Sequence, residues 1–309
     1  MQNWWQTTFP QGLQKVSIQT ADGKTLKLAF GEKGQGRPLV LVHGVGSWSY
    51  SWRHLIDPLA QQFRVICLDA RGYGFSDKPP DPDPPGHQIG DLAQAIRALC
   101  PEPAAIMAES LGALVSLAVA QTQPDLVARL VLINVPIFPV ELPSLGMRLL
   151  ADLPLTWVRA VDQARLAYWL APLVRSIVWL GRQEVVADPS EVSEDEVYWL
   201  AYPYVEFPNA ITKFAENLQQ LAREIRALHQ GQPSLLQPIQ AQLASVHCPT
   251  LILWSEQDRW FPVAHGEQLR AQLPNARLEI LANCGHSAAA GCPAAVSAAA
   301  VPFLQDFAC

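Results

Sequence analysis

Short runs of consecutive apolar residues recur along the chain, and segments with helical spacing of apolar positions lie between them. The runs are PLVLVHG at 38–44, RVICLD at 64–69, AAIMAES at 104–110, RLVLINV at 129–135 and PTLILWS at 249–255, with a weaker one, RLEILA, at 277–282. Unbroken apolar runs are typical of strands that are covered on both faces, as in a parallel sheet. Because these strands alternate with helices, the pattern predicts an α/β fold with a mostly parallel, doubly wound sheet.

Two features depart from this alternation. The segments KVSIQT and TLKLAF, joined by the Asp-Gly turn ADGK, predict a β-hairpin before the first run. Farther on, roughly 110 residues without an obvious strand separate Val135 from Thr250. A loop of this length is rarely structureless in a compact domain, and AITKFAENLQQLAREIRALHQ has helical spacing, so we predict a helical insertion. The expected organisation is a core formed by residues 1–135 and 245–309, with the insertion at 136–244.

The insertion is rich in aromatic residues and contains four of the ten tryptophans, Trp157, Trp169, Trp179 and Trp199. We expect most of its aromatic residues to pack the insertion onto the core, and some of its apolar residues to line a ligand pocket. Three basic residues are candidates for steering an acidic substrate, with ordinary helix-surface charge as the alternative: Arg175, Arg182 and Lys213.

Composition narrows the classes of protein. Half of the 309 residues are hydrophobic and 16% are charged, which predicts a large buried core and some exposed apolar surface. The formal net charge of −6 leaves no basic surface for nucleic acid, so no nucleic-acid partner is expected. The apolar run at 166–181 is short for a bilayer and contains Pro172 and Arg175, so we expect no transmembrane segment.

The cysteines and the first residues bear on cofactors and compartment. The six cysteines form no C-x-x-C pair and show no zinc-ligand spacing, so neither a metal site nor a redox motif is expected. A secretory signal begins with a cationic segment followed by an apolar run, and MQNWWQTTFPQG has neither. We therefore expect a reducing, cytoplasmic location.

Ser110 ends one apolar run and begins a helical segment, which is the context of a nucleophile on a tight strand–turn–helix connection. Such a turn needs small residues two positions before and two positions after the serine, and here these are Ala108 and Gly112. The usual pattern is G-x-S-x-G, so the alanine adds one methyl group to the turn. Taken alone, AESLG fits an ordinary strand–helix connection equally well.

A candidate acid and base follow in the chain order Ser, acid, His. His286 lies past the last strand-like run, where its imidazole can take the serine proton; the alternative is a surface histidine. Asp258 follows the run that ends at 255 and can hold the imidazole in one tautomer, with Glu256 as a rival. Asp69 also ends a strand, and there we expect an ion pair with Arg71 instead.

The loop VHGVGSW, after the first strand of the series, is a candidate for stabilising developing negative charge. Gly44 and Gly46 let backbone N–H groups approach an oxyanion closely, and we predict the N–H groups of Val45 and Leu111 as donors. The alternative is an ordinary glycine turn in which His43 only packs or forms a hydrogen bond. Four such signals, each at the end of its own predicted strand and in one chain order, favour the catalytic interpretation of Ser110.

Five segments carry a resemblance to a known family: LVHGVG, DARGYGFSDKP, AESLGAL, LILWSEQDRWFP and NCGHS. Over nearly its whole length the chain resembles α/β-hydrolase fold proteins with a helical cap, the branch that includes esterases, C–C bond hydrolases, haloalkane dehalogenases and epoxide hydrolases. The resemblance implies that the insertion is a cap seated over the triad. The chain departs from the family pattern at Ala108, at Ser255, where glycine often precedes the acid, and in AGCPAAV.

The type of nucleophile separates these relatives. Dehalogenases and epoxide hydrolases use an aspartate at the elbow, whereas Ser110 favours attack on an acyl carbon and an acyl-enzyme. We therefore expect a serine hydrolase without cofactor or metal, acting on a small-molecule ester with an apolar acyl or aromatic group. C–C bond hydrolases, thioesterases and lactonases that use the same triad remain alternatives, as does a non-catalytic ligand-binding protein. The oligomeric state is left open.

Overall fold

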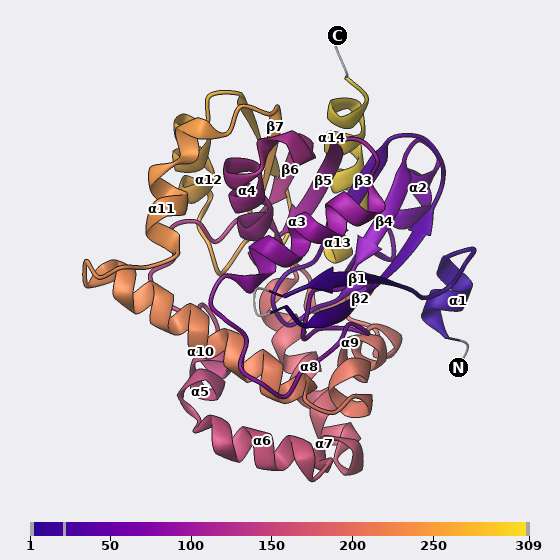
Figure 1. Ribbon diagram of the computed structural model, residues 1–309, viewed down its shortest axis with the longest axis vertical. Coiled ribbons are helices and arrows are strands. Elements are labelled where there is room, and N and C mark those ends of the chain that lie inside the picture. Colours follow the sequence, from indigo (N-terminus) through magenta and orange to yellow (C-terminus); the bar gives the residue numbers. More distant parts are fainter. Residues whose placement is uncertain (1–2, 21–22, 307–309) are drawn as a thin grey trace.

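An eight-stranded sheet forms the centre of the computed structural model, which describes residues 3–20 and 23–306 (Figure 1). The strands are β1 (Gln14–Gln19), β2 (Thr25–Lys33), β3 (Pro38–Val42), β4 (Arg64–Leu68), β5 (Ala104–Glu109), β6 (Val127–Ile133), β7 (Thr250–Ser255) and β8 (Ala276–Leu281). Their order is β1-β2-β4-β3-β5-β6-β7-β8. β2 pairs antiparallel with β1 and β4, and all other neighbours are parallel. The predicted α/β fold and the N-terminal hairpin are confirmed, although residues 21–22 of the expected turn lie outside the described residues.

Helices cover both faces of the sheet. They are α1 (Trp4–Thr8), α2 (Ile56–Ala60), α3 (His87–Leu99), α4 (Leu111–Thr122), α12 (Val263–Gln272), α13 (Ala288–Gly291) and α14 (Pro293–Gln305). Val40 and Ile106 pack in the cluster that contains residues of α3 and α4, whereas their neighbours Leu41 and Met107 pack in the cluster that contains residues of α2 and α14. Consecutive strand residues point to opposite faces, so two covered faces require unbroken apolar runs.

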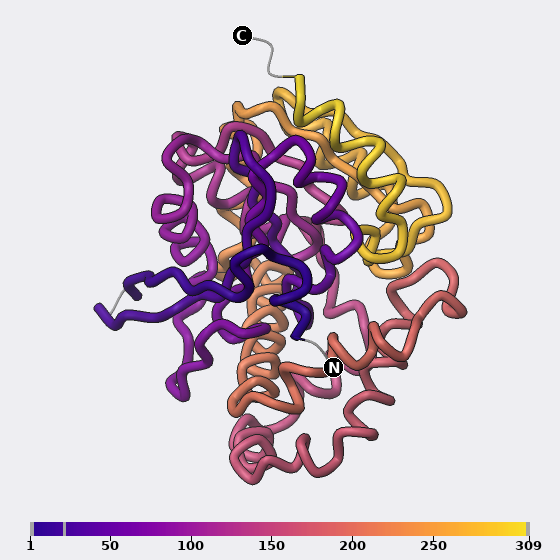
Figure 2. Tube along the Cα trace, turned by 90° about the vertical axis from the view of Figure 1, so that its right-hand side faces the viewer, coloured from indigo at the N-terminus to yellow at the C-terminus, as the bar shows by residue number. Residues whose placement is uncertain are grey.

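The chain between β6 and β7 is helical, as predicted. It forms α5 (Leu145–Asp152), α6 (Leu155–Gln163), α7 (Leu166–Trp169), α8 (Ala171–Val185), α9 (Glu194–Glu206), α10 (Ala210–His229) and α11 (Leu236–Ala241). Helices α5 to α10 lie at the end of the molecule opposite α14 (Figure 1), and the same separation is visible in the view turned by 90° (Figure 2). Leu218 of α10 and Ser110, which follows β5, line one cavity, so the insertion lies over the carboxyl end of this strand.

A buried network of charges fastens α10 to the loop before α3. The Nζ of Lys213, a fully buried residue, lies 2.8 Å from Asp83 Oδ2 and 3.0 Å from Glu216 Oε2. Arg71 also pairs with Asp83, at 3.1 Å, and with Asp91, at 2.6 Å. Because a buried charge that loses its partner is strongly destabilising, this network holds the insertion in place. Lys213 therefore fixes the fold and does not steer a substrate.

The tryptophans of the insertion divide into two groups. Trp199 is buried and packs against Trp48 of the core, with ring centroids 6.5 Å apart. Trp157, Trp169 and Trp179 are 68%, 74% and 45% exposed. Trp199 follows the expectation that most of the insertion's aromatic residues pack it onto the core, whereas Trp157, Trp169 and Trp179 are exceptions that lie on helix sides facing away from the core.

Residues 3–20 and 23–306 contain neither a membrane-spanning helix nor a cluster of metal-binding side chains. No helix there combines the length and apolar character needed to cross a membrane. No group of three or more His, Cys, Asp or Glu side chains there is arranged to hold a metal ion. The five cysteines within these ranges are free thiols.

Candidate active site

Ser110 stands at a sharp turn between β5 and α4. Its backbone has φ 53° and ψ −126°, a conformation that residues other than glycine rarely adopt and that occurs at strained functional turns. A Cβ at Gly112 would lie 2.4 Å from the carbonyl oxygen of His43, so only glycine fits this close approach. The predicted strand–turn–helix connection is therefore present, with the serine at its apex.

The alanine two positions before the serine fits without disturbing the sheet. Ala108 is fully buried and pairs with Val42 of β3 on one side and with Leu132 of β6 on the other. The only irregularity of the β5–β6 pairing within the described residues lies at the far end of the strand, between Ala104 and Ala105. The extra methyl group is thus accommodated as an ordinary core residue.

A continuous chain of hydrogen bonds joins Ser110 to a histidine and a carboxylate. His286 Nε2 lies 3.0 Å from Ser110 Oγ, and His286 Nδ1 lies 2.8 Å from Asp258 Oδ2. The other oxygen, Asp258 Oδ1, accepts hydrogen bonds from the N–H groups of Trp260 (2.8 Å) and Phe261 (3.0 Å). Both oxygens of the carboxylate are therefore held, and the ring donates its Nδ1–H to Asp258 while Nε2 is free to accept from the serine.

The rival carboxylate lies elsewhere. Glu256 Oε2 accepts a hydrogen bond from the N–H of Asn283 at 3.2 Å, on the exposed side of the loop. The histidine ring packs instead between aromatic side chains, with its centroid 4.6 Å from that of Trp260 and 5.4 Å from that of Phe261. The structure thus brings together Ser110, His286 and Asp258 and leaves Glu256 outside.

Asn134, at the end of β6, is a part of this site that the sequence did not indicate. Its Nδ2 donates to Ser255 Oγ at 2.9 Å and to the carbonyl oxygen of His286 at 2.7 Å, and its Oδ1 accepts from the N–H of Ser255 at 2.8 Å. Asn134 has φ 49°, in the left-handed region that asparagine tolerates better than most residues. This side chain ties the loop that carries His286 to the end of β7.

The glycine turn after β3 lies against the serine. A Cβ at Gly44 would come within 3.0 Å of Ser110 Cβ, and Gly46 has φ 74°. Val45 lines the cavity beside Ser110, and Leu111 begins α4, where first-turn N–H groups have no partner within the helix. Neither N–H is bonded to another group in the part of the chain that the structure describes.

His43 holds this turn in place. Its Nε2 accepts a hydrogen bond from the N–H of Ala70 at 3.0 Å, so its Nδ1 carries the proton and donates to the Gly44 carbonyl oxygen at 2.8 Å. Burial lowers the pKa of the His43 imidazole, which favours the neutral ring that this arrangement requires. The hydrogen-bonding alternative for His43 thus fits its surroundings.

The expected ion pair between Asp69 and Arg71 is absent among the described residues. Asp69 is buried and accepts hydrogen bonds from the N–H and hydroxyl of Ser49 and from the N–H of Phe75. Arg71 pairs with the carboxylates of the α10 network described above. Backbone donors close to Asp69 in the fold, rather than the nearest charge in sequence, satisfy its carboxylate.

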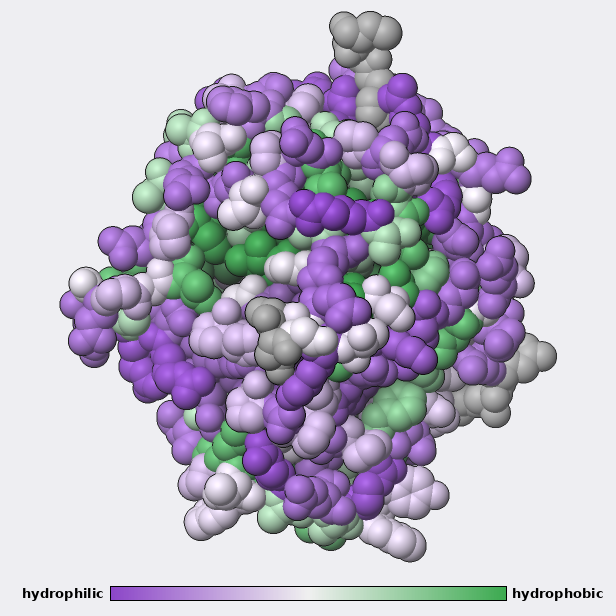
Figure 3. Space-filling view, viewed as in Figure 1, coloured by the Kyte–Doolittle hydropathy of each residue, from purple (hydrophilic) through white to green (hydrophobic). Residues whose placement is uncertain are grey.

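An apolar cavity of about 50 Å³ adjoins Ser110. Among the described residues that line it, three have a side chain that carries an oxygen or nitrogen: Ser110, Glu141 and Trp260. None of these lining residues is basic. A second cavity of about 80 Å³ lies next to it. Four leucines line both cavities: Leu111, Leu114, Leu221 and Leu236. Apolar surface gathers around a hollow near α4 and α11 on the face shown in Figure 3.

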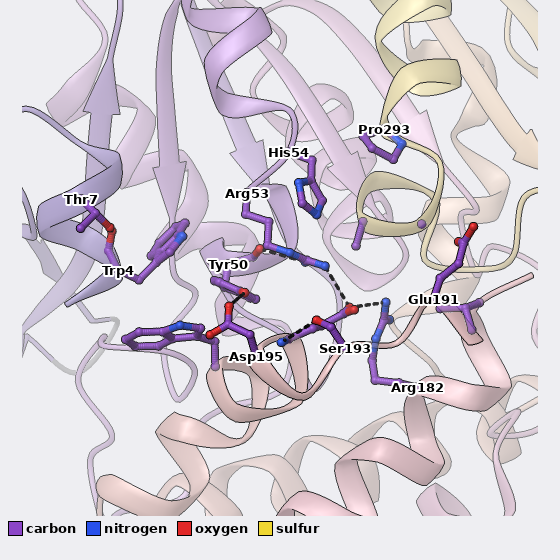
Figure 4. Close-up of a pocket in the computed structure, with 15 residues that line it drawn as sticks. Trp4, Thr7, Tyr50, Arg53, His54, Arg182, Glu191, Ser193, Asp195 and Pro293 are labelled. Atoms are coloured by element: carbon purple, nitrogen blue, oxygen red, sulfur yellow. Dashed lines mark hydrogen bonds and ion pairs between the residues drawn. The ribbon is translucent and has the colours of Figure 1, made fainter. Parts of the chain in front are cut away.

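A larger cleft, with a volume of about 840 Å³, opens between the core and the insertion and is lined by other residues. Arg53 of the core and Arg182 of α8 point toward each other across it (Figure 4), and both pair with Glu196 of α9, at 3.2 and 2.7 Å. This shared carboxylate fastens the insertion to the core. Arg182, a candidate for steering a substrate, is therefore occupied by an internal ion pair.

Glu109 precedes the serine and faces the opposite side of the strand. Its Oε1 accepts a hydrogen bond from the N–H of Ala289 at 2.9 Å. Burial raises the pKa of the Glu109 carboxyl, and the hydrogen bond from Ala289 opposes this only in part. Glu109 thus joins the elbow to α13, which follows the histidine loop.

Comparison with known proteins places the chain in a family. A family model described as alpha/beta hydrolase fold matches residues 37–290. The 2-hydroxy-6-oxononadienedioate/2-hydroxy-6-oxononatrienedioate hydrolase of Escherichia coli is 26% identical over 273 residues, which cover 85% of this chain and 86% of that protein.

Two solved structures have the same fold. A thermophilic esterase from Thermogutta terrifontis superimposes with a TM-score of 0.69 and 21% identity, covering 94% of this chain and 98% of that one. The meta-cleavage product hydrolase of Pseudomonas fluorescens IP01 gives a TM-score of 0.70 and 21% identity, covering 94% and 97%. With the match over residues 37–290, this sheet order and this elbow, the chain belongs to the α/β-hydrolase fold family and is an enzyme of the hydrolase type.

Proposed function

We propose that the protein is a serine hydrolase that needs no cofactor and cleaves carboxylic esters with an apolar acyl group. The observation that carries this proposal is the hydrogen-bonded series Ser110–His286–Asp258 at a strained elbow, with distances of 3.0 and 2.8 Å. A nucleophile within hydrogen-bond reach of a base, which is itself oriented by a third group, is the arrangement that nucleophilic catalysis requires.

The proposed reaction proceeds through an acyl-enzyme. His286 Nε2 takes the proton of Ser110 as Oγ bonds to the ester carbonyl carbon, and the carbonyl oxygen becomes an oxyanion facing the N–H groups of Val45 and Leu111. When the carbonyl re-forms, the C–O bond to the alcohol breaks and His286 returns the proton to the leaving oxygen. Water then repeats these steps on the acyl-enzyme and releases the acid. Asp258 stabilises the imidazolium that forms twice in each cycle.

The lining of the cavity beside Ser110 supports an uncharged, apolar acyl group. Burying a carboxylate without a cation is costly, and no basic side chain of the described residues lines this space. We also propose that the insertion, residues 136–244, acts as the cap that shapes the substrate site, because Leu218 and Met147 of its helices form one wall.

A C–C bond hydrolase is the second candidate, and the name of the E. coli relative favours it. The dioate in that name is a dianion, whereas the cavity beside Ser110 offers no cation to receive it. This contrast ranks the ester reaction first. Thioesters and lactones, which would follow the same acyl-enzyme route, are possible variants of the ester substrate.

The test is hydrolysis of p-nitrophenyl esters from acetate to palmitate by wild type and Ser110→Ala, beside a 2-hydroxy-6-oxo-dienoate. We expect one preferred acyl length in wild type and no enzymatic turnover in the variant. Selective cleavage of the dienoate would replace the ester proposal with the C–C reaction. Full ester hydrolysis by Ser110→Ala would remove Ser110 from the mechanism. If no substrate turns over and a fluorophosphonate leaves Ser110 unlabelled, the non-catalytic alternative replaces the proposal.

A further inference from the structure

Exposed apolar side chains gather on one part of the molecule. Within the described residues, 14 of the 16 large apolar side chains that are exposed lie between Val140 and Leu180, on α5 to α8 and the links beside them. The other two are Leu235 and Ile280. We call the exposed large apolar residues between Val140 and Leu180 the outer face. A concentration of exposed apolar side chains in one part of a protein is typical of an interaction site.

The spacing of most of these residues follows the helical repeat. Along α5, α6 and the link between them the exposed positions recur every four residues: Leu145, Leu149, Leu153, Trp157 and Val161. Along α7 and α8 five of them recur every three or four residues, Leu166, Trp169, Leu173, Ile177 and Leu180, and Tyr168, Leu170 and Trp179 beside these are exposed as well. Such intervals follow the helical repeat. The opposite sides are occupied, because α5 and α6 pack along α10 and α8 packs along α9.

The composition of the outer face suits the boundary between water and lipid. Trp157 and Trp169 are 68% and 74% exposed, and Ile177 is 60% exposed. Tryptophan is enriched at membrane–water boundaries because one part of its ring system is apolar and another donates a hydrogen bond. No helix of the described residues can cross a bilayer, so contact with lipid would place these helices in the plane of its surface. α6 and α7 form the lower edge of the molecule in Figures 1 and 3.

The charge around the outer face is the reverse of that of the whole protein. Between Val140 and Leu180, the bounds of the outer face, there are four arginines, two aspartates and one glutamate, a formal charge of +1 in a chain of −6. The residues are Arg148, Arg159, Arg165, Arg175, Glu141, Asp152 and Asp162, and Arg148 pairs with Glu141. Asp162 is buried, and its Oδ2 accepts hydrogen bonds from the N–H and the hydroxyl of Thr212. Positive charge beside apolar surface is complementary to anionic lipid.

Three of these arginines have no carboxylate partner in residues 3–20 and 23–306. Arg159 and Arg165 donate to backbone carbonyl oxygens, and Arg175 lies over the ring of Tyr198, 4.9 Å from its centroid. Their charges are therefore not neutralised by the fold. In a two-fold contact between copies of this chain, the same positive region would face itself, which disfavours self-association through this face.

We propose that the outer face docks on the surface of an anionic lipid bilayer, with α6 to α8 lying among the headgroups. Met147 of α5 lines the cavity beside Ser110, while Leu145 and Leu149 of the same helix belong to the outer face. A docked molecule would hold one wall of this cavity close to the lipid, where apolar substrates concentrate. Docking itself does not depend on the proposed ester chemistry, so its test uses binding alone.

The test measures co-sedimentation of the full chain, as Ser110→Ala, with sucrose-loaded vesicles. One set contains phosphatidylcholine and the other equal parts of phosphatidylcholine and phosphatidylglycerol. We expect at least about tenfold stronger partitioning into the anionic vesicles, reduced by salt. Adding Trp157→Glu, Trp169→Glu and Ile177→Glu should lower it at least about tenfold. The control, Leu235→Glu with Ile280→Glu, makes the same kind of substitution at both exposed apolar residues outside the outer face, two added charges against three, and should bind as the parent does.

Thermal unfolding and sedimentation velocity accompany each binding measurement. The proposal is overturned if the folded parent, Ser110→Ala, does not bind anionic vesicles. It is also overturned if the triple glutamate variant and the control bind these vesicles equally well. If the parent is a dimer and the triple variant is a monomer, and the two bind vesicles equally, the outer face is instead a contact between two copies of this chain. Binding that shows no preference for phosphatidylglycerol would remove the role of the arginines and, with it, the choice of an anionic surface.

Discussion

Replacing Asn134 with alanine removes three buried hydrogen bonds that anchor the histidine loop. The N–H of Ser255 and the carbonyl oxygen of His286 lose their partners at 2.8 and 2.7 Å. Each buried group left unpaired costs about 1–3 kcal/mol, so we expect the free energy of unfolding to fall by about 2–6 kcal/mol. Alanine in the left-handed backbone region adds about 1–2 kcal/mol to this loss.

Asn209→Ala is the matched control, because Asn209 also has a left-handed backbone, with φ 65°. Its Nδ2 makes one partly buried hydrogen bond, to the Lys78 carbonyl oxygen at 3.1 Å. The backbone cost is common to both variants and cancels in the comparison. Asn134→Ala should therefore be less stable than Asn209→Ala by about 3 kcal/mol in urea unfolding.

Activity gives the second part of this test. A displaced His286 should lower kcat/KM for the preferred ester about 100-fold in Asn134→Ala, because misplacement by about 1 Å costs a factor of this size. Asn209→Ala should retain activity close to that of wild type. Equal stability and equal activity of the two variants would refute this role of Asn134, because its hydrogen bonds to His286 and Ser255 would then contribute neither to folding nor to the position of the histidine.

Three further predictions concern the acid, the buried carboxyl and the acyl cavity. Asp258→Asn should lower kcat about 10⁴-fold, while Glu256→Gln stays near wild type in the same ester assay; the reverse order would reassign the acid. Burial raises the pKa of the Glu109 carboxyl, so the folded state favours its protonated form. Protonated Glu109 therefore adds to the free energy of unfolding at low pH, and this contribution is lost as pH rises through the raised pKa. The free energy of unfolding of Glu109→Gln, measured across this pH range, should not show this decrease. Parallel pH profiles for the variant and wild type would contradict the prediction. Leu221 lines both apolar cavities. Leu221→Ala should raise kcat/KM for longer acyl chains at least about tenfold, whereas Leu228→Ala, which alters neither lining, should leave the chain-length profile unchanged.

Much of the fold was predictable because the strands of a doubly covered sheet must be apolar on both sides. The same logic placed Ser110, Asp258 and His286 at the carboxyl ends of strands, where a parallel sheet brings distant segments together. Asn134 escaped prediction because its partner Ser255 lies 121 positions away and no local pattern marks such a pair.

The errors have physical reasons too. The pairing of Asp69 with Arg71 looked favourable along the chain, but the fold supplies Asp69 with N–H donors and gives Arg71 other carboxylates. The exposed tryptophans could not be distinguished from packing residues, because helical spacing gives an apolar side without saying what covers it. Only the position of α9 and α10 shows that the outer face lies on the far side of α5 to α8.

The central claim is that Ser110 is an activated nucleophile. Its most direct test is the intact mass of the protein after treatment with a fluorophosphonate, followed by peptide mapping, for wild type and Ser110→Ala. We predict that wild type gains one phosphonyl group, on Ser110, with loss of fluoride, and that the variant gains none. A wild type that stays unmodified, or a label on another residue that persists in Ser110→Ala, would contradict the account.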